Sequence, residues 1–286
     1  MRKSLFSGKL YNQGFGELTK QLEALFENGP GDLPISSRNK DIKGIIAPCV
    51  NYLLSGTISA WAYKELGESK FPELFILLGD TKLGKGEDKA YLSLRDFETP
   101  LGIVKNSGLN SDQDIIVVDE LIHEKESCLE LQLPFLQFVS RDRLARIKIM
   151  PILFDKCSHD TLVSIANMIK SLKKDYVIIT SSNLTMYGEK FNFTPFRYNI
   201  KGEVNALDLM SRDLILKLNS NDFLEHASKY NLNISYQSIF VMLEVLKGKF
   251  KGKELMYGNS GDITEDFNNF VTYGSFIFKE EKWMEE

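Results

Sequence analysis

Residues 42–56, IKGIIAPCVNYLLSG, contain the pattern that decides the fold. The apolar run at 45–47 predicts a buried strand, and Pro48 stops that strand because proline has no N–H to donate to a ladder. A tight loop follows, and a helical pattern begins after Gly56. Because α/β folds place their chemistry at the carboxyl ends of strands, we expect Cys49 to lie on the floor of a pocket.

The alternation of apolar strands and amphipathic helices continues along the chain. The segments 73–79 and 175–180 predict buried strands, whereas the alternating segment 89–95 predicts an antiparallel or edge strand. The apolar segment 114–118 is compatible with either a helix or a strand. The other predicted elements are helices at 16–27, 57–66, 127–139, 159–172, 201–217, 222–229 and 238–246, and strands at 145–153, 254–259 and 270–278. We therefore predict one α/β domain over residues 1–286, with a central mixed sheet and helices on both of its faces.

The composition is that of an ordinary soluble globular protein, with a formal net charge of −4 and 43% hydrophobic residues. The mild acidity disfavours a nucleic-acid surface, which would need clustered Lys and Arg. No apolar run is long enough to span a bilayer, and no apolar stretch follows the first residues as in a secretory signal. The three cysteines have unrelated spacings and form no disulfide framework, so we expect a cytoplasmic protein.

Short motifs spread in order over nearly the whole chain carry a family resemblance. They include SGxxY at 7–11, IIAPxxxYxxxG at 45–56, ExxxExxLPF at 126–135, IITSS at 178–182 and YGNSGD at 257–262. These motifs resemble the Memo family, also met as the B component of the AmmeMemoRadiSam group, which is related to class III extradiol dioxygenases. The resemblance implies an extradiol dioxygenase-like α/β fold.

The resemblance also implies a pocket whose family histidines are replaced in this chain. Cys49 stands where the family has the histidine of its Ala-Pro-His motif, and Ser127 and Gln132 stand at two further histidine positions. The run after the second strand reads Asp80-Thr81-Lys82 in place of a histidine-containing run. We therefore expect a vestigial pocket made of Cys49, Asp80, Lys82, Ser127, Glu130, Asn183 and Met186.

The metal chemistry of the family is not expected here. A 2-His-1-carboxylate iron site needs imidazoles, and none of His123, His159 and His226 falls on a family ligand position. We therefore expect no metal and no cofactor. A rearranged site stays open, in which His123 would join Cys49, Cys128 or Asp80, although the loop composition of residues 120–126 favours a solvent-facing side chain for His123.

Lys82 takes the place of an imidazole that the relatives point inward. A buried ammonium without a partner is costly, so we expect Lys82 to pair with Glu130 or Asp80 and to occupy the former metal site. Cys49 can be read as a nucleophile, as a soft metal ligand or as a small buried side chain.

Two classes of function are consistent with these residues. The first is a non-catalytic binding or adaptor protein, a pseudoenzyme, whose partner is an unknown protein or small molecule. The second is an enzyme, either a metal-dependent oxidoreductase of the dioxygenase type with substitute ligands or an enzyme centred on Cys49. The retained scaffold motifs and the replaced histidines favour the first class.

Overall fold

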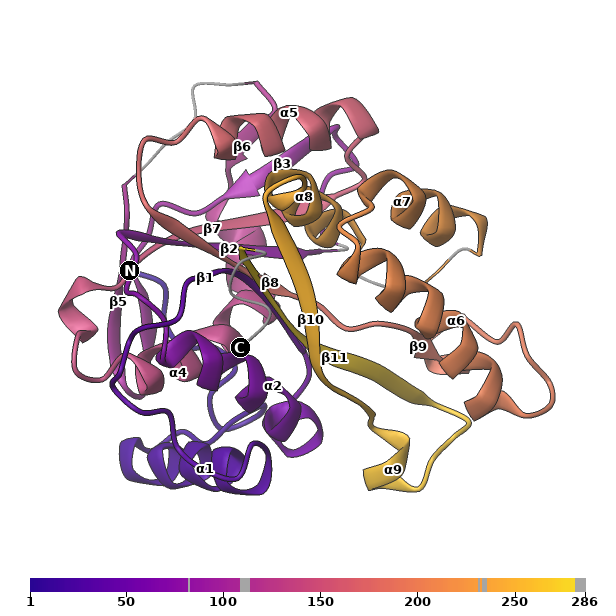
Figure 1. The fold of residues 1–286 in the computed structure, drawn as a ribbon, viewed down its shortest axis with the longest axis horizontal. Coiled ribbons are helices and arrows are strands. Elements are labelled where there is room, and N and C mark those ends of the chain that lie inside the picture. The colour runs from indigo at the N-terminus through magenta and orange to yellow at the C-terminus, as the bar shows by residue number, and fades with distance from the viewer. Residues whose placement is uncertain (82, 109–113, 231, 233–235, 281–286) are drawn as a thin grey trace.

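A mixed sheet forms the centre of the protein, and its elements are labelled in Figure 1. The computed structural model describes residues 1–81, 83–108, 114–230, 232 and 236–280. The strands are β1 (Ile42–Ala47), β2 (Leu74–Asp80), β3 (Lys89–Leu92), β4 (Phe97–Thr99), β5 (Gly102–Asn106), β6 (Ile116–Val118), β7 (Lys148–Asp155), β8 (Tyr176–Ser181), β9 (Met186–Tyr187), β10 (Phe250–Asn259) and β11 (Phe270–Glu280). The α-helices are α1 (Phe15–Asn28), α2 (Tyr52–Gly67), α3 (Glu120–Lys125), α4 (Cys128–Val139), α5 (His159–Lys170), α6 (Ile200–Leu216), α7 (Ser220–Lys229), α8 (Tyr236–Leu246) and α9 (Gly261–Thr264).

The main strand order is β10-β11-β1-β8-β2-β7-β3-β6. The central strands β1, β8, β2 and β7 run parallel, while β11 is antiparallel to β1 and β3 is antiparallel to β7. Because the central strands are parallel, their carboxyl ends at Ala47, Ser181, Asp80 and Asp155 lie along the same edge of the sheet.

Helices cover both faces of the sheet (Figure 1). On one face, residues of α1, α2 and α4 pack with Ile45, Leu77 and Ile179 of the strands. On the other face, residues of α5, α6, α7 and α8 pack with Ile46 and Ile76. Residues next to each other in a strand pack against helices on opposite faces of the sheet, because successive side chains of a strand point to opposite faces. The predicted α/β domain, with a mixed sheet between two helical layers, is confirmed.

The helix after the first strand begins at Tyr52, so the predicted start after Gly56 is wrong. The side chain of Asn51 caps this helix by accepting the N–H of Leu54 at 3.0 Å. Gly56 lies inside the helix, where a Cβ would come within 2.6 Å of the side chain of Leu25 in α1. The glycine therefore allows two helices to approach closely rather than marking a helix end.

Further differences lie between β3 and α4. The undecided segment at 114–118 contains β6, which pairs in parallel with β3. β3 is antiparallel to β7 as predicted, but it has a neighbour on each side and is not an edge strand. The loop expected at 120–126 is instead α3, because the carboxylate of Asp119 accepts the N–H groups of Leu121 and Ile122. The short strands β4, β5 and β9 were not predicted.

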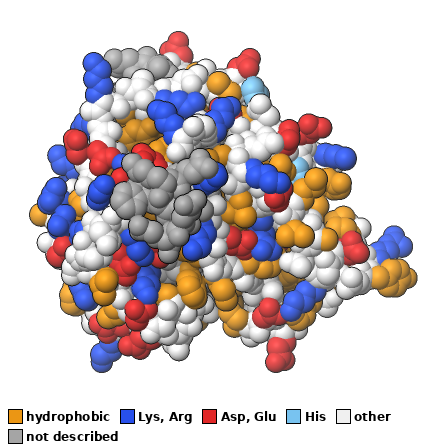
Figure 2. Space-filling model, viewed as in Figure 1, with side chains coloured by type: hydrophobic (Ala, Val, Ile, Leu, Met, Phe, Trp, Pro, Cys, Tyr) orange, Lys and Arg blue, Asp and Glu red, His pale blue; other side chains and the backbone are white. Residues whose placement is uncertain are grey.

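One face of the protein carries side chains of every type. On the face in Figure 2, basic and acidic side chains are interspersed with hydrophobic ones. Within the described part of the chain, we find no helix with both the length and the apolar character needed to cross a bilayer.

Replacement of Gly56 by Ala is expected to destabilise the protein. The new Cβ would lie 2.6 Å from Leu25 Cδ1, and such overpacking costs about 1–3 kcal/mol. This outweighs the gain of up to about 1 kcal/mol that Ala has over Gly within a helix. Urea unfolding of the purified protein measures the change.

Gly16→Ala is the matched control, because nothing lies within 4 Å of a Cβ at this helical glycine. We expect it to leave stability unchanged or to raise it by up to about 1 kcal/mol. Adding Leu25→Ala to Gly56→Ala should make the cost of the alanine at position 56 disappear. A Gly56→Ala midpoint at or above that of the unmodified protein would contradict the packing argument.

Candidate functional site

A pocket of about 790 Å³ lies at the carboxyl edge of the parallel strands. It is lined by residues that follow or end β1, β8, β2 and β7, and by the first residues of α4 and α8. The predicted site residues among its lining are Cys49, Asp80, Ser127, Asn183 and Met186. The described part of the structure thus brings five of the seven candidates to one cavity. Lys82 lies outside the described residues, and Glu130 lies elsewhere.

Asn183 holds the backbone of Cys49. Its side-chain oxygen accepts the Cys49 N–H at 2.9 Å, and its side-chain nitrogen donates to the Cys49 carbonyl at 3.4 Å. An amide can serve both groups because it carries an acceptor and a donor, whereas an ionised carboxylate only accepts. Asn183 therefore fixes the loop that follows Pro48.

Asp80 connects the end of β2 to the start of α8. Its carboxylate accepts the backbone N–H groups of Gln237 at 3.0 Å and of Ser238 at 2.8 Å. These N–H groups belong to the first turn of a helix, where they have no partner inside the helix and where the dipole favours a negative charge. Burial raises the pKa of Asp80 to about 6, and the hydrogen bonds from Ser238 and Gln237 oppose that rise.

Glu130 does not line the pocket and is completely buried at the first turn of α4. Its carboxylate accepts bonds from Arg2 at 2.5 Å, from the hydroxyl of Tyr11 at 2.7 Å, and from the N–H groups of Phe6 at 3.0 Å and Leu5 at 3.2 Å. Burial and the neighbouring carboxylate raise the pKa of Tyr11 well above its usual value, so the hydroxyl is a donor. The charge of Glu130 is therefore fully engaged by residues near the start of the chain.

Arg2 extends this network to the wall of the pocket. Its Nε donates to the carbonyl of His123 at 2.8 Å, and its Nη2 donates to the carbonyl of Glu126 at 3.1 Å. The first carbonyl belongs to α3, and the second belongs to the junction between α3 and α4. The side chain of Glu126 in turn accepts the N–H groups of Ser127 at 3.0 Å and Cys128 at 3.4 Å. The Arg2 guanidinium thus positions the segment that presents Ser127 to the pocket.

His123 is buried, with 2% of its surface exposed, so the expected solvent-facing side chain is wrong. Its Nε2 lies 3.0 Å from the carbonyl of Tyr91 in β3, and its ring packs edge-on against Phe97. Burial lowers the pKa of His123 to about 4. The ring therefore belongs to the contact between α3 and β3 and is not among the side chains that line the pocket.

The described donors of the pocket do not fit a 2-His-1-carboxylate iron site. They include the thiols of Cys49 and Cys128, the hydroxyl of Ser127, the amide of Asn183 and the thioether of Met186. No described side chains of His, Cys, Asp or Glu form a group of three or more that could hold a metal ion. Imidazole is the donor that such an iron site requires, and the described lining contains none.

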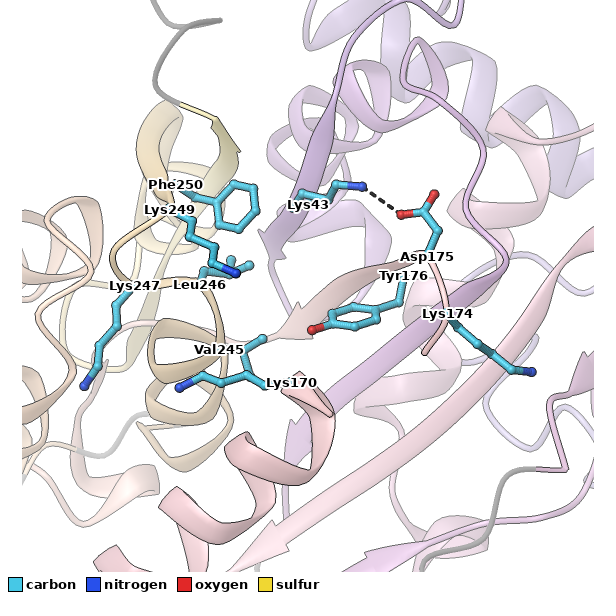
Figure 3. A pocket seen from close by; sticks show the side chains of 10 residues that line it. All are labelled: Lys43, Lys170, Lys174, Asp175, Tyr176, Val245, Leu246, Lys247, Lys249 and Phe250. Atoms are coloured by element: carbon cyan, nitrogen blue, oxygen red, sulfur yellow. Dashed lines mark hydrogen bonds and ion pairs between the residues drawn. The ribbon is translucent and has the colours of Figure 1, made fainter. Parts of the chain in front are cut away.

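A second cavity, of about 400 Å³, lies at the opposite edge, near the starts of β1, β8 and β10 (Figure 3). Lysines surround the rings of Tyr176 and Phe250 there. However, Lys43 bonds to Asp175 at 2.8 Å, and in Figure 3 the side chains of Lys174 and Lys247 extend in opposite directions. Because these ammonium groups do not converge on one point, we regard the carboxyl-edge pocket as the stronger candidate site.

Several residues of the site were not predicted. Asp155 and Lys156 line the pocket at the end of β7, and the rule that identified Asp80 would have found them had the strand predicted at 145–153 been extended. The motif that contains Tyr11 was recognised, but its bond to Glu130 was not. Tyr236 reaches the pocket through the tertiary placement of α8, for which the sequence carries no local signal.

Replacement of Glu130 by Gln is expected to destabilise the protein strongly. The substitution keeps the size of the side chain but leaves the guanidinium of Arg2 buried without an opposite charge. Breaking one side of a buried ion pair costs about 3–5 kcal/mol, to be measured by urea unfolding. Asp213→Asn is the control, because its pair with Lys217 is exposed and worth at most about 1 kcal/mol. Equal effects of the two substitutions would contradict the structural role of Glu130.

The raised pKa of Asp80 predicts a pH dependence of stability. Its pKa of about 6 exceeds the ordinary value of 3.8, so the folded state binds the proton more tightly than the unfolded state. The contribution of Asp80 to the unfolding free energy therefore falls as the pH rises from about 4 to about 6, by on the order of 3 kcal/mol. Asp80→Asn removes this dependence.

The measurement is the difference in unfolding free energy between Asp80→Asn and the unmodified protein at several pH values. His123, with its pKa lowered to about 4, makes stability rise with pH over an overlapping range, but it does so in both proteins and cancels in the difference. We expect the difference to move in favour of the variant by about 2–3 kcal/mol between pH 4 and pH 7. Parallel stability curves would show that Asp80 does not titrate in this window.

Comparison with known proteins identifies the family of this chain. The sequence model of the Memo family, described as Memo-like protein, matches residues 2–277. A MEMO1 family protein of Methanobrevibacter smithii is 30% identical over 296 residues, which cover 98% of this chain and 100% of the relative. MEMO1 family proteins of Methanocaldococcus jannaschii and Methanococcus vannielii are 30% and 28% identical, and the matches cover at least 97% of this chain. The resemblance seen in the motifs is confirmed, and the chain belongs to the Memo-like protein family.

Proposed function

We propose that this Memo-like protein is a non-catalytic, cytoplasmic binding protein whose carboxyl-edge pocket holds a neutral or cationic small molecule. The observation that carries the proposal is the state of the pocket's polar side chains. Three of them, Asp80, Glu126 and Asn183, bond to the protein's own backbone, and apolar side chains also line the pocket. The volume of about 790 Å³ is in the range of small-molecule sites, which span roughly 300–1,000 Å³.

The engaged polar groups support a binding role over catalysis. The carboxylate of Asp80 caps α8, the amide of Asn183 holds Cys49, and the carboxylate of Glu126 accepts N–H groups at the start of α4. A general base must instead reach a proton of the substrate. In this pocket the same residue types hold the ends of secondary-structure elements in place.

The charge of the lining supports a neutral or cationic ligand. Among the described lining residues, Asp80, Glu126 and Asp155 are acidic, and Lys156 is basic. Burial raises the pKa values of Asp80 and Glu126, because the charged form of a carboxyl group is disfavoured away from water. Phe191 supplies an aromatic wall against which a flat ligand can pack.

The alternative is an enzyme. A Cys49-centred enzyme would need a base beside the thiol, and two carboxylates of the pocket, Asp80 and Glu126, are engaged in backbone hydrogen bonds. A metal-dependent oxidoreductase would need a ligand set other than that of the related dioxygenases. Elemental analysis, described below, distinguishes the metal-dependent alternative from ligand binding.

Ligand binding is expected to stabilise the protein and to depend on Met186. Neutral, cationic and anionic fragments with the same ring are compared by thermal shift, and a ligand at 100 times its Kd adds about 2.7 kcal/mol. Met186→Trp should remove the shift, because the larger ring fills a pocket that Met186 lines. Met256→Trp is the control, since Met256 is exposed on β10 and does not line the pocket. Fragments that stabilise both variants equally, or a preference for anionic fragments, would contradict the proposal.

Elemental analysis after anaerobic reconstitution with Fe(II) tests the enzymatic alternative. We expect no stoichiometric iron. About one equivalent of iron per chain, lost on Cys49→Ala, would overturn the non-catalytic assignment in favour of a metal-dependent oxidoreductase with a thiolate ligand.

A further inference from the structure

Two cysteines from distant parts of the sequence meet at the carboxyl-edge pocket. Cys49 follows β1, and Cys128 is the first residue of α4. Both line the pocket, and their thiols lie close enough to interact, because Cys49 is one of the groups that raise the pKa of Cys128. Both are free thiols.

The main chain on each side of this contact is held by the end of β8. The hydroxyl of Ser181 donates to the carbonyl of Cys128 at 2.7 Å, and Asn183 bonds to the backbone of Cys49. Gln132 links the two segments directly, because its Nε2 donates to the carbonyl of Pro48 at 2.9 Å and to the Ser181 hydroxyl at 2.7 Å. The contact between the thiols is therefore set by the scaffold and not by a flexible loop.

The two thiols differ in their access to solvent. Cys128 is 3% exposed, and its Sγ lies 3.9 Å from the carbonyl of Asp80. Gly79 leaves the room for this sulfur, because a Cβ there would lie 2.6 Å from it. Cys49 is only half-buried. A small reagent that enters the pocket therefore reaches Cys49 first.

We propose that Cys49 and Cys128 form an oxidisable dithiol site, at which a small hydroperoxide converts the pair into a disulfide across the pocket floor. In the first step, the Cys49 sulfur attacks one peroxide oxygen, the O–O bond breaks, and the Cys49 S–H becomes S–OH with release of water or an alcohol. In the second step, the Cys128 sulfur attacks the Cys49 sulfur, the S–O bond breaks, and the released hydroxide and the Cys128 proton form water. The hydroperoxide is the two-electron oxidant, and the two thiols are oxidised.

The position of Cys128 predicts which step is slow. The N-terminus of α4 favours a thiolate at Cys128, but burial raises the pKa of this thiol well above its usual value. The thiolate is the attacking form, so closure of the disulfide should accelerate with pH, by up to about tenfold per unit below the thiol pKa. Oxidation that stops at Cys49 should accumulate at lower pH.

The experiment uses the reduced full chain and hydrogen peroxide. After oxidation, free thiols are alkylated in denaturant, and peptides are mapped by mass spectrometry with and without dithiothreitol. We expect one disulfide that joins the peptides containing residues 49 and 128, and alkylation of Cys157 alone. Cys157 is the internal control, because burial raises its pKa to about 12 and it does not line the pocket.

Variants separate the two steps. Cys128→Ser should stop at a sulfenic acid on Cys49 that dimedone traps, Cys49→Ser should abolish rapid oxidation, and Cys157→Ser should behave as the unmodified protein. Three alkylated thiols after peroxide treatment of the unmodified chain would overturn the proposal. A disulfide that involves Cys157, or overoxidised Cys49 beside an alkylated Cys128, would overturn it as well. These measurements need no pocket ligand, so their outcome is independent of the outcome of the ligand-binding test.

Discussion

The buried ion pair between Arg2 and Glu130 is the constraint on which the pocket wall depends. Two charges removed from water must satisfy one another and their remaining hydrogen-bonding capacity, and here the carboxylate has four donors. The same guanidinium holds carbonyls of α3 and of the α3–α4 junction. The segment at the start of the chain therefore determines where α4 begins, and with it where Ser127 and Cys128 stand relative to the sheet.

One position at which the family resemblance implies an imidazole carries scaffold hydrogen bonds in this chain. Gln132 accepts the hydroxyl of Tyr63 at 2.9 Å and donates to the carbonyl of Pro48 and to Ser181, so both ends of its amide are used. An amide is suited to this because it donates and accepts without bringing a charge into the core. The carboxyl edge is thus held by neutral bonds between neighbouring strands and α4, and the pocket above it has a fixed floor.

The order and type of most elements could be predicted, because apolar strands and amphipathic helices differ in period. The rule that chemistry gathers at the carboxyl ends of parallel strands brought Cys49, Asp80 and Asn183 to one place. Two kinds of error have physical reasons. Gly56 was taken as a helix boundary, although its missing Cβ serves helix packing, and His123 was assigned to solvent from the loop composition of residues 120–126. Contacts such as that of Arg2 with Glu130 join residues 128 positions apart in the sequence, and local patterns do not encode them.

The strand order also determines how the sheet ends. The main path terminates at β6, which is only three residues long, and at β10, whose outer side would otherwise present a row of backbone groups to another chain. β10 carries exposed Lys251 and Lys253, and its pairing with β11 is irregular between Glu254 and Met256. Charges and irregular pairing on an edge disfavour the addition of a foreign strand. These features protect an open sheet of many strands from edge-to-edge aggregation, although the sheet does not close into a barrel.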